Sequence, residues 1–502
     1  MRLLPGTNIL TALRKLLASA LLALLAACYP ALPSAGGASS TAPSPAARWT
    51  PPTPSPSEAG DLRLAADELP PALESRRTQL NTTDLVALAL ERSPETRTSW
   101  LTAQAAAASY GNARSILFPD IAGSVAINRL KTAATGGRVS VEQTTYGPSL
   151  SLSWLLLDFG GRAGAIDAAR DELFAANWTH NAMISDVVRR TLQGYFSYVA
   201  ARSLVGANRV TLEQAQVNLA AAEDRRTVGV ATIAETMQAR SAVSQALLIV
   251  QQSEGALAST RGALAVLIGL PPTAAFEVDT TEASAAITPV VETVDSLMKI
   301  GLLDRPDLAA ERAQVDARRA VTRETRSQYL PSLSATGATS SVWVGSNSQS
   351  YPSYNIGVAL AIPIFNGWGW QYATRAAALT ADAEAARLRN MEQQVALQVY
   401  QSYQELRTAT QSVSTAEELI ASAGSAADAT RARYREGVGS LLELLSAENV
   451  LASARSQQIQ SRAEWHTSLV QLAHDAGLLA PTGATSLHPA PASPSNAPGN
   501  KQ

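Results

Sequence analysis

The sequence contains few of the residues that form disulfides, metal sites and catalytic sites. Its 502 residues include one cysteine and four histidines, and aromatic residues make up only 5% of the chain. A single cysteine excludes an intrachain disulfide. Two of the histidines are eight residues apart, which is wider than the spacing of a helical metal-binding pair. We expect no metal and no cofactor from the scattered histidines, which are His180, His466, His474 and His488.

Charge is scarce as well. Only 16% of the residues are charged and the net charge is −2, so the sequence offers no basic surface for nucleic acid. It also lacks a Walker phosphate-binding loop and a nucleophile elbow. We therefore expect a protein that is not an enzyme.

The first 27 residues have the pattern of a secretory signal peptide. Arg2, Arg14 and Lys15 precede an apolar run over 16–25, and small residues lead from it to Cys28. Similarity to bacterial lipoproteins implies cleavage before this cysteine and acylation of its thiol and new amino group. The alternative is an ordinary signal peptide followed by an unrelated cysteine.

Two segments of low complexity flank the centre of the chain. Residues 28–78 and 480–502 are dense in Pro, Ser and Ala and hold few large apolar residues. Such segments cannot bury enough surface to fold, so we expect a disordered tether and a disordered tail, although either could bind a partner. Tyr29 stands where lipoproteins retained in the inner membrane tend to carry Asp, and this favours the outer membrane.

An alternating stretch at 149–161 predicts a transmembrane β-strand. Small polar residues share one face of this strand and large apolar residues share the other. About ten residues suffice for a tilted strand to cross a bilayer, and a second alternating stretch covers 354–364. One such strand alone could be the edge of a soluble sheet, but two copies argue against that interpretation. The apolar face of the first comprises Leu150, Leu152, Trp154 and Leu156, and the polar face comprises Ser149, Ser151 and Ser153.

Between the two tails the sequence repeats once. Pro94 matches Pro306 at an offset of 212 (306 − 94), and Gly229 matches Gly437 at an offset of 208 (437 − 229). We expect repeat 1 over 79–271, a linker over 272–292 and repeat 2 over 293–479. Each repeat should hold two short helices, two strands and a long helical hairpin. The expected strands lie at about 120–130, 147–157, 332–344 and 354–364, and the expected hairpins at about 160–268 and 368–476.

A heptad repeat indicates that the hairpins are coiled coils. Apolar residues recur every seven positions, and the offset of 208 places one copy of the pattern on the other. A polar glutamine in this seam indicates imperfect burial or a role in setting the register. The matched positions are Val243, Val250, Leu257 and Leu264 in repeat 1 and Leu451, Gln458, Trp465 and Leu472 in repeat 2.

These features together resemble the TolC-type outer-membrane efflux family, in its lipoprotein branch. The resemblance rests on the lipoprotein signal, the twofold repeat, the strand ends at 157–162 and 365–367 and the turns of the two hairpins, and it covers about residues 80–478. It implies an α+β membrane protein in which four strands of each chain contribute to a trimeric, 12-stranded outer-membrane β-barrel. A coiled-coil α-barrel would continue this barrel into the periplasm. Independently, open sheet edges are not tolerated in lipid, which requires oligomerisation if the strands span the membrane.

The resemblance also implies a function, partners and site residues. The function would be a passive exit duct of a tripartite pump that exports drugs or other toxic small molecules. The partners would be a periplasmic adaptor and an inner-membrane pump of the resistance-nodulation-division type. A duct for type I protein secretion, or a coiled-coil lipoprotein without a pore, are the alternatives. The implied adaptor-contacting tips are Val228, Gly229, Val230, Gly437, Val438 and Gly439, and the implied entrance gate is Tyr434 with Glu443.

Relatives can carry charged residues at the positions of Gly439 and Ser446, so we expect fewer polar links at this entrance. Solvated ion pairs are the alternative role for Glu443 and for Glu235, which matches it in repeat 1. Likewise, the two glycine turns could be helix-hairpin turns and nothing more.

Overall fold

The computed structural model describes residues 79–133, 140–281, 283, 287, 292–345 and 349–479. The described elements belong to one of the chain's two compact units, residues 67–502. The expected lipidation residue Cys28, the whole expected tether at 28–78 and the expected tail at 480–502 lie outside the described residues.

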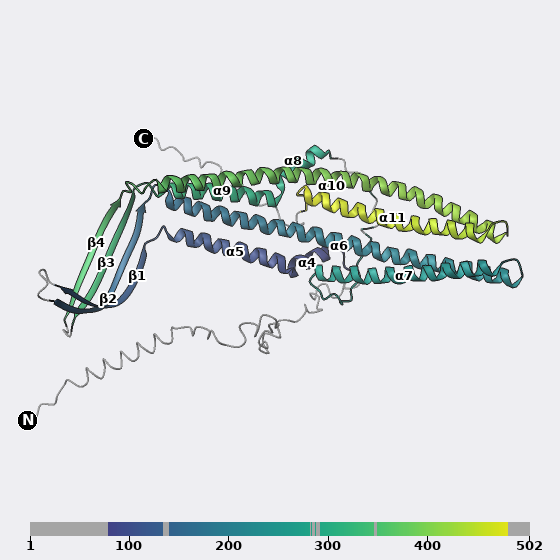
Figure 1. Ribbon diagram of the computed structural model, residues 1–502, viewed down its shortest axis with the longest axis horizontal. Helices are drawn as coiled ribbons and strands as arrows, with labels where there is room; N and C mark the ends of the chain where they lie inside the picture. The colour runs from purple at the N-terminus through teal and green to yellow at the C-terminus, as the bar shows by residue number, and fades with distance from the viewer. Residues whose placement is uncertain are drawn as a thin grey trace, which may run out of the picture. The chain divides into compact units, whose positions relative to one another are not determined.

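The described elements run through the same order twice (Figure 1). Helices α6 and α10 have 67 residues each, and helices α7 and α11 have 35 each. The first series is α4 (Thr82–Arg92), α5 (Pro94–Ser115), β1 (Asp120–Ala133), β2 (Ser140–Leu157), α6 (Gly161–Thr227) and α7 (Ile233–Leu267). The second is α8 (Val294–Asp304), α9 (Pro306–Ser327), β3 (Ser332–Val344), β4 (Ser350–Ala361), α10 (Gly369–Arg435) and α11 (Leu441–Asp475).

The four strands form one antiparallel sheet in the order β1-β2-β3-β4. The register aligns Ser149 with Ser124 and with Ser340, so small polar residues share one face across neighbouring strands. Large apolar residues on the other face, such as Val125 and Ile356, are exposed. Strands β1 and β4 are the sheet's two open edges.

Four strand boundaries differ from the sequence expectation. Strand β1 ends at Ala133 rather than 130, and strand β4 begins at Ser350 rather than 354. Strand β2 begins at Ser140 rather than 147, because its polar N-terminal part pairs with β1 although it does not alternate. Strand β4 ends at Ala361 rather than 364, just before Pro363, whose nitrogen cannot donate a hydrogen bond to a neighbouring strand.

The helices next to the sheet form a wall in which α5 packs on α6, α6 on α9 and α9 on α10. In the half farther from the sheet, α7 pairs with α6 and α11 pairs with α10 (Figure 1). Among the heptad residues, Leu264 and Leu472 are buried in separate apolar clusters, and Gln458 is half-buried. Within the described residues, no helix is both long and apolar enough to cross a membrane.

The turns from strand to long helix contain two residues in succession with left-handed backbone. They are Phe159 (φ 51°) and Gly160 (φ 106°) after β2, and Gly367 (φ 69°) and Trp368 (φ 70°) before α10. This conformation costs an L-residue roughly 1–2 kcal/mol. After β2, Arg162 also ties the helix to the strand, because its guanidinium donates to the carbonyls of Leu155 (2.6 Å) and Leu156 (2.7 Å).

Candidate functional site: the hairpin tips and the groove between them

Each long hairpin ends in the same backbone turn, at the end away from the sheet (Figure 1). In the first tip, the amide of Gly229 donates to the carbonyl of Arg226 and the amide of Val230 donates to that of Arg225. In the second tip, Gly437 and Val438 repeat both hydrogen bonds at their matching positions. This is the Schellman motif, which needs a left-handed residue after the helix, and both glycines have φ near 80°.

The valines of the tips are exposed. Val228 and Val230 flank the glycine of the first tip, and Val438 follows that of the second. The turns hold these side chains in water, although burying them would be favourable. The arrangement suits contact with an apolar partner surface.

The two acidic residues that follow the tips have different partners. Thr232 caps α7, and the carboxylate of Glu235 accepts a hydrogen bond from the amide of Thr232, which completes a capping box. Ser440 caps α11 in the same way, but the carboxylate of Glu443 instead lies 3.4 Å from the guanidinium of Arg433. Both of these side chains are about half exposed, so the pair is close to solvent.

The structure places Tyr434 between the two hairpins rather than on a free surface. Its side chain is 4% exposed and packs with Ala222, Ala239 and Leu444. The guanidinium of Arg225 lies 4.9 Å from the ring centre and donates a hydrogen bond of 2.9 Å to the Tyr434 carbonyl. Burial raises the pKa of the Tyr434 hydroxyl, and the positive charge of Arg225 opposes this effect.

Sequence reasoning missed the role of Arg225. The backbone carbonyl of this residue belongs to the first tip turn, and its guanidinium reaches the second. The only available signal was the offset of 208, which matches Arg225 to Arg433 (433 − 225). The offset cannot show that Arg225 contacts the other hairpin, whereas Arg433 contacts a residue of its own hairpin.

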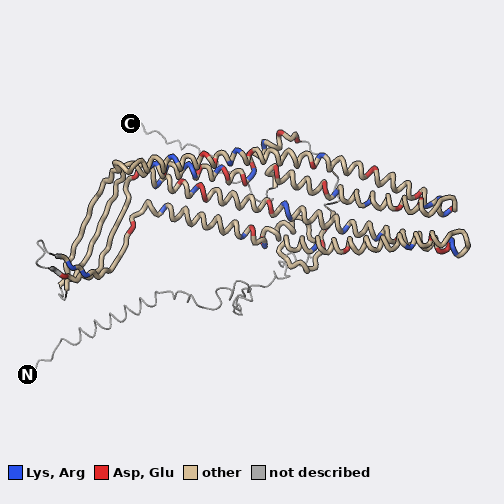
Figure 2. Tube along the Cα trace, viewed as in Figure 1, with Lys and Arg blue, Asp and Glu red and all other residues tan. Residues whose placement is uncertain are grey.

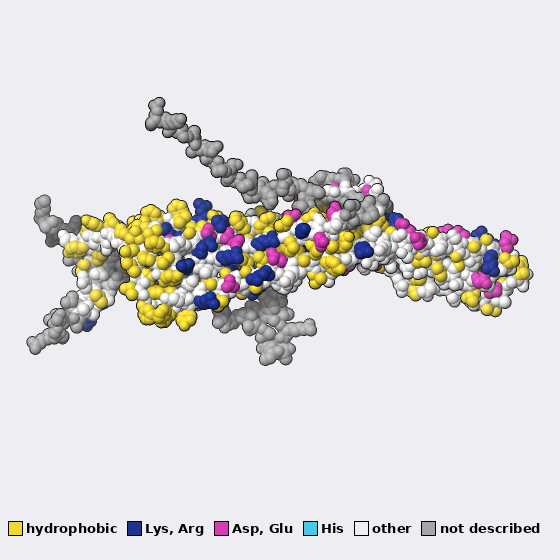
Figure 3. All heavy atoms as spheres, turned by 90° about the horizontal axis from the view of Figure 1, so that it is seen from above, with side chains coloured by type: hydrophobic (Ala, Val, Ile, Leu, Met, Phe, Trp, Pro, Cys, Tyr) yellow, Lys and Arg dark blue, Asp and Glu magenta, His cyan; other side chains and the backbone are white. Residues whose placement is uncertain are grey.

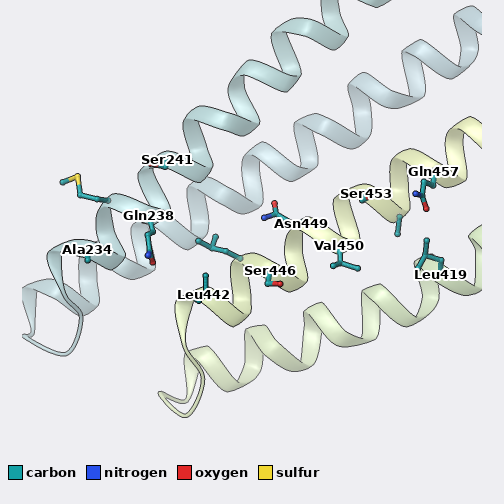
Figure 4. Close-up of a pocket in the computed structure, with 13 residues that line it drawn as sticks. Ala234, Gln238, Ser241, Leu419, Leu442, Ser446, Asn449, Val450, Ser453 and Gln457 are labelled. Carbon is teal, nitrogen blue, oxygen red and sulfur yellow. The ribbon is translucent and has the colours of Figure 1, made fainter.

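A groove of about 1060 Å³ separates α7 from α11 close to the tips (Figure 4). Its walls combine amides, hydroxyls and apolar side chains, and none of the described residues that line it is charged. Ser446 lies in this wall, whereas Gly439 lies in the second tip turn. Charged residues occur along the helices close to both tips (Figure 2). The lining includes Gln238 and Ser241 of α7 and Leu442, Ser446, Asn449 and Val450 of α11.

The histidines do not form a metal site within the part of the chain that the structure describes. The ring of His466 stacks on Phe196 of α6 at 4.3 Å, and its Nε2 lies 3.1 Å from the carbonyl of Ala283 in the linker. This histidine therefore holds three segments together. Burial lowers its pKa.

Comparison with known proteins identifies the family. A family model described as "Outer membrane efflux protein" matches residues 85–270 and 297–478. The chain belongs to the outer membrane efflux protein family. The two matched segments correspond to the two series of helices and strands. Members of this family are outer-membrane channels, which confirms the expectation that the chain is not an enzyme.

Individual relatives and structures agree with this family. The chain is 26% identical to Protein CyaE of Bordetella pertussis over 430 residues, which cover 82% of this chain and 86% of that protein. It is 27% identical over 440 residues to the pyoverdine export outer membrane protein OpmQ of Pseudomonas aeruginosa, covering 81% and 85% of the two chains. The fold matches the Campylobacter jejuni CmeC outer membrane channel with a TM-score of 0.69 and 20% identity, covering 79% of this chain and 85% of that one.

Proposed function

We propose that the chain is one protomer of a homotrimeric exit duct in the outer membrane, which exports small molecules as part of a tripartite efflux pump. The observation that carries this proposal is the pair of open edges. The sheet ends at β1 and β4, and the helical wall ends at α5 and α10. Unpaired strand edges in hydrocarbon leave backbone groups without partners, so each edge needs a second copy.

The faces of the sheet support the same arrangement. The exposed apolar face suits lipid, and the face with Ser124, Ser149 and Ser340 suits a water-filled lumen. A coiled-coil lipoprotein without a pore has no need for such strands. Three copies would give twelve strands, a number that follows from the family resemblance.

Cross-linking in mild detergent tests the trimer. Products should stop at three chains, and the same preparation should conduct ions in planar bilayers. A folded monomer, or a trimer without conductance, would contradict the duct.

The tips and the groove support docking of a periplasmic adaptor that contacts an inner-membrane pump. A helical hairpin could place apolar residues on Val230 and Val438 and lay a polar stripe along the uncharged groove. Val438→Asp should abolish cross-linking between adaptor and duct, because burying an unpaired carboxylate is unfavourable. Ser244→Asp, which adds the same charge to an exposed site on α7 away from the tips, is the control.

Small-molecule export is the function that we favour over protein secretion, because OpmQ is named for pyoverdine export and matches most of the chain. Deletion of the gene should increase susceptibility to small toxic compounds and leave the secreted proteins unchanged. Loss of a secreted protein with unchanged susceptibility would instead indicate type I secretion.

We also propose that Cys28 carries the lipid anchor. Cys28→Ser should abolish labelling by a radiolabelled fatty acid while trimers still insert, since the apolar strand faces hold the protein in the membrane. Labelling that persists in Cys28→Ser would exclude this anchor.

A further inference from the structure

The two turns that join strand to long helix share a backbone conformation but exchange two residue types. At the offset of 208, Phe159 matches Gly367 and Gly160 matches Trp368. All four residues have a left-handed backbone conformation. Each turn therefore carries one glycine and one aromatic residue, in opposite order.

The backbone does not require the aromatic residues. Left-handed φ values favour glycine, and a Cβ built on Gly160 or Gly367 would meet nothing within 4 Å. Two glycines would therefore adopt either turn with less strain. The next residue in each turn differs in this respect, because a Cβ on Gly161 would lie 2.4 Å from the hydroxyl of Ser327 and one on Gly369 would lie 2.8 Å from the Asn366 side chain.

Packing within the chain does not explain the aromatic residues either. Phe159 is 55% exposed and Trp368 is 62% exposed. Among the described residues, Trp368 has one aromatic contact, with Phe365 at 6.1 Å between ring centres, and Phe365 is itself exposed. The strained residues thus present apolar rings to the surroundings.

Their place in the fold indicates what surrounds them. Both turns lie where the sheet joins the helices, next to exposed apolar strand residues such as Leu157 and Leu360 (Figure 1). In the space-filling view, hydrophobic side chains gather over this junction and charged side chains begin beyond it on the helices (Figure 3). Aromatic side chains concentrate at this level in membrane barrels, where the hydrocarbon meets the lipid headgroups.

We propose that Phe159 and Trp368 anchor the protein in the headgroup region of the periplasmic phospholipid leaflet, and that their strained backbone is retained because the rings set the depth of the barrel. This proposal rests on the proposed function, which places the strands in the outer membrane. The opposite order of glycine and aromatic residue in the two turns supports this proposal. Both repeats have an aromatic ring at the junction, but the ring stands at a different backbone position in each.

Spin labels measure the depth of each position. Cys28→Ser leaves the full chain without cysteine, so single cysteines can be labelled at 159 and 368 in phospholipid vesicles. Val358, on the apolar face of β4, is the hydrocarbon reference, and Val230 at the tip is the aqueous reference. Labels at 159 and 368 should give an oxygen-to-nickel accessibility ratio between those of the two references.

Each other outcome has a distinct meaning. An aqueous signal at 358 would refute the membrane barrel itself. A hydrocarbon signal at 358 together with fully aqueous signals at 159 and 368 would overturn the anchors alone. Labels at 159 and 368 that neither reagent reaches would show contact with a second copy of the chain, and would also overturn the anchors.

Substitution tests whether the rings set the depth. The double variant Phe159→Gly with Trp368→Gly should shift the accessibility ratio of the label at 358, and it should melt no earlier than the wild type in detergent because strain is removed. The matched control exchanges the order in repeat 1, Phe159→Gly with Gly160→Phe, and should keep the wild-type ratio. An unchanged ratio in the double variant, or earlier melting in detergent, would overturn the proposal.

Discussion

The two hairpin tips have the same backbone turn, but the side chains at matching positions make different contacts. Arg225 and Arg433 correspond, yet the first bonds across to the other hairpin and the second pairs with Glu443 of its own. Tyr434 is buried between the hairpins, whereas its counterpart Arg226 is exposed. The lengths of the helices and the turns are therefore common to both copies. The contact between the hairpins joins Tyr434, which only repeat 2 has, to an arginine that both copies have but that reaches across only from repeat 1.

Removing Tyr434 should break this contact most severely. Tyr434→Ala leaves a cavity between the tips and should cost about 3 kcal/mol, the lower end for truncating a large buried aromatic side chain. Amide hydrogen exchange at the two tips should accelerate by roughly a hundredfold, if the tips open as one unit. Arg226→Ala, at the matching exposed position, should leave exchange unchanged. Equal effects of the two variants would mean that Tyr434 does not hold the tips together.

The two arginines give a smaller contrast. Arg225→Ala removes a hydrogen bond and a cation–π contact between the hairpins, and should cost about 1–2 kcal/mol. Arg433→Ala removes an exposed ion pair that is worth less than about 1 kcal/mol. Thermal melting of the purified protein should therefore separate the variants. A larger shift for Arg433→Ala would contradict the assignment of the link between the hairpins to Arg225.

Local sequence patterns predicted the helices, the strands and the positions of both tip turns, because each depends on periodicity and on glycine at a helix end. They could not predict the partner of Arg225, since the contact joins residues 209 positions apart and depends on how two hairpins pack. The same limit applies to the groove, whose walls come from α7 and α11. The left-handed conformation of Trp368 was also missed, because no propensity favours it in an aromatic residue.

A pH dependence should distinguish the central parts of the two repeats. His466 matches Ala258 in repeat 1 (466 − 208 = 258), so only repeat 2 has a titratable group at this position. Burial lowers the pKa of His466, and the nearby charge of Arg462 acts in the same direction, although the hydrogen bond to Ala283 opposes both. The unfolded or opened state therefore binds the proton more readily than the folded state. Neutral His466 thus stabilises the folded state, and this stabilisation is fully present above about pH 6.5.

The stabilisation from neutral His466 should decrease as the pH falls from about 6.5 towards and through the lower pKa that His466 has in the folded state. Hydrogen exchange in the linker near Ala283 should accelerate over that range in the wild type. His466→Gln should remove the pH dependence while keeping a side chain that can donate to the carbonyl. If the acceleration persists in His466→Gln, another group is responsible for it.

The smallest effect on stability, but a specific one on transport, should come from the two acidic residues. Glu235→Gln keeps a side chain that can complete the capping box, and Glu443→Gln loses only an exposed ion pair, so both variants should fold.

Glu443→Gln leaves Arg433 without its counter-charge in each of three proposed protomers. If Glu443 lines the entrance, this local positive charge should reduce cation selectivity and weaken block by multivalent cations in planar bilayers. Glu235, which is engaged in its cap, should matter less, and equal effects of the two substitutions would exclude Glu443 from the entrance while leaving the proposed duct intact.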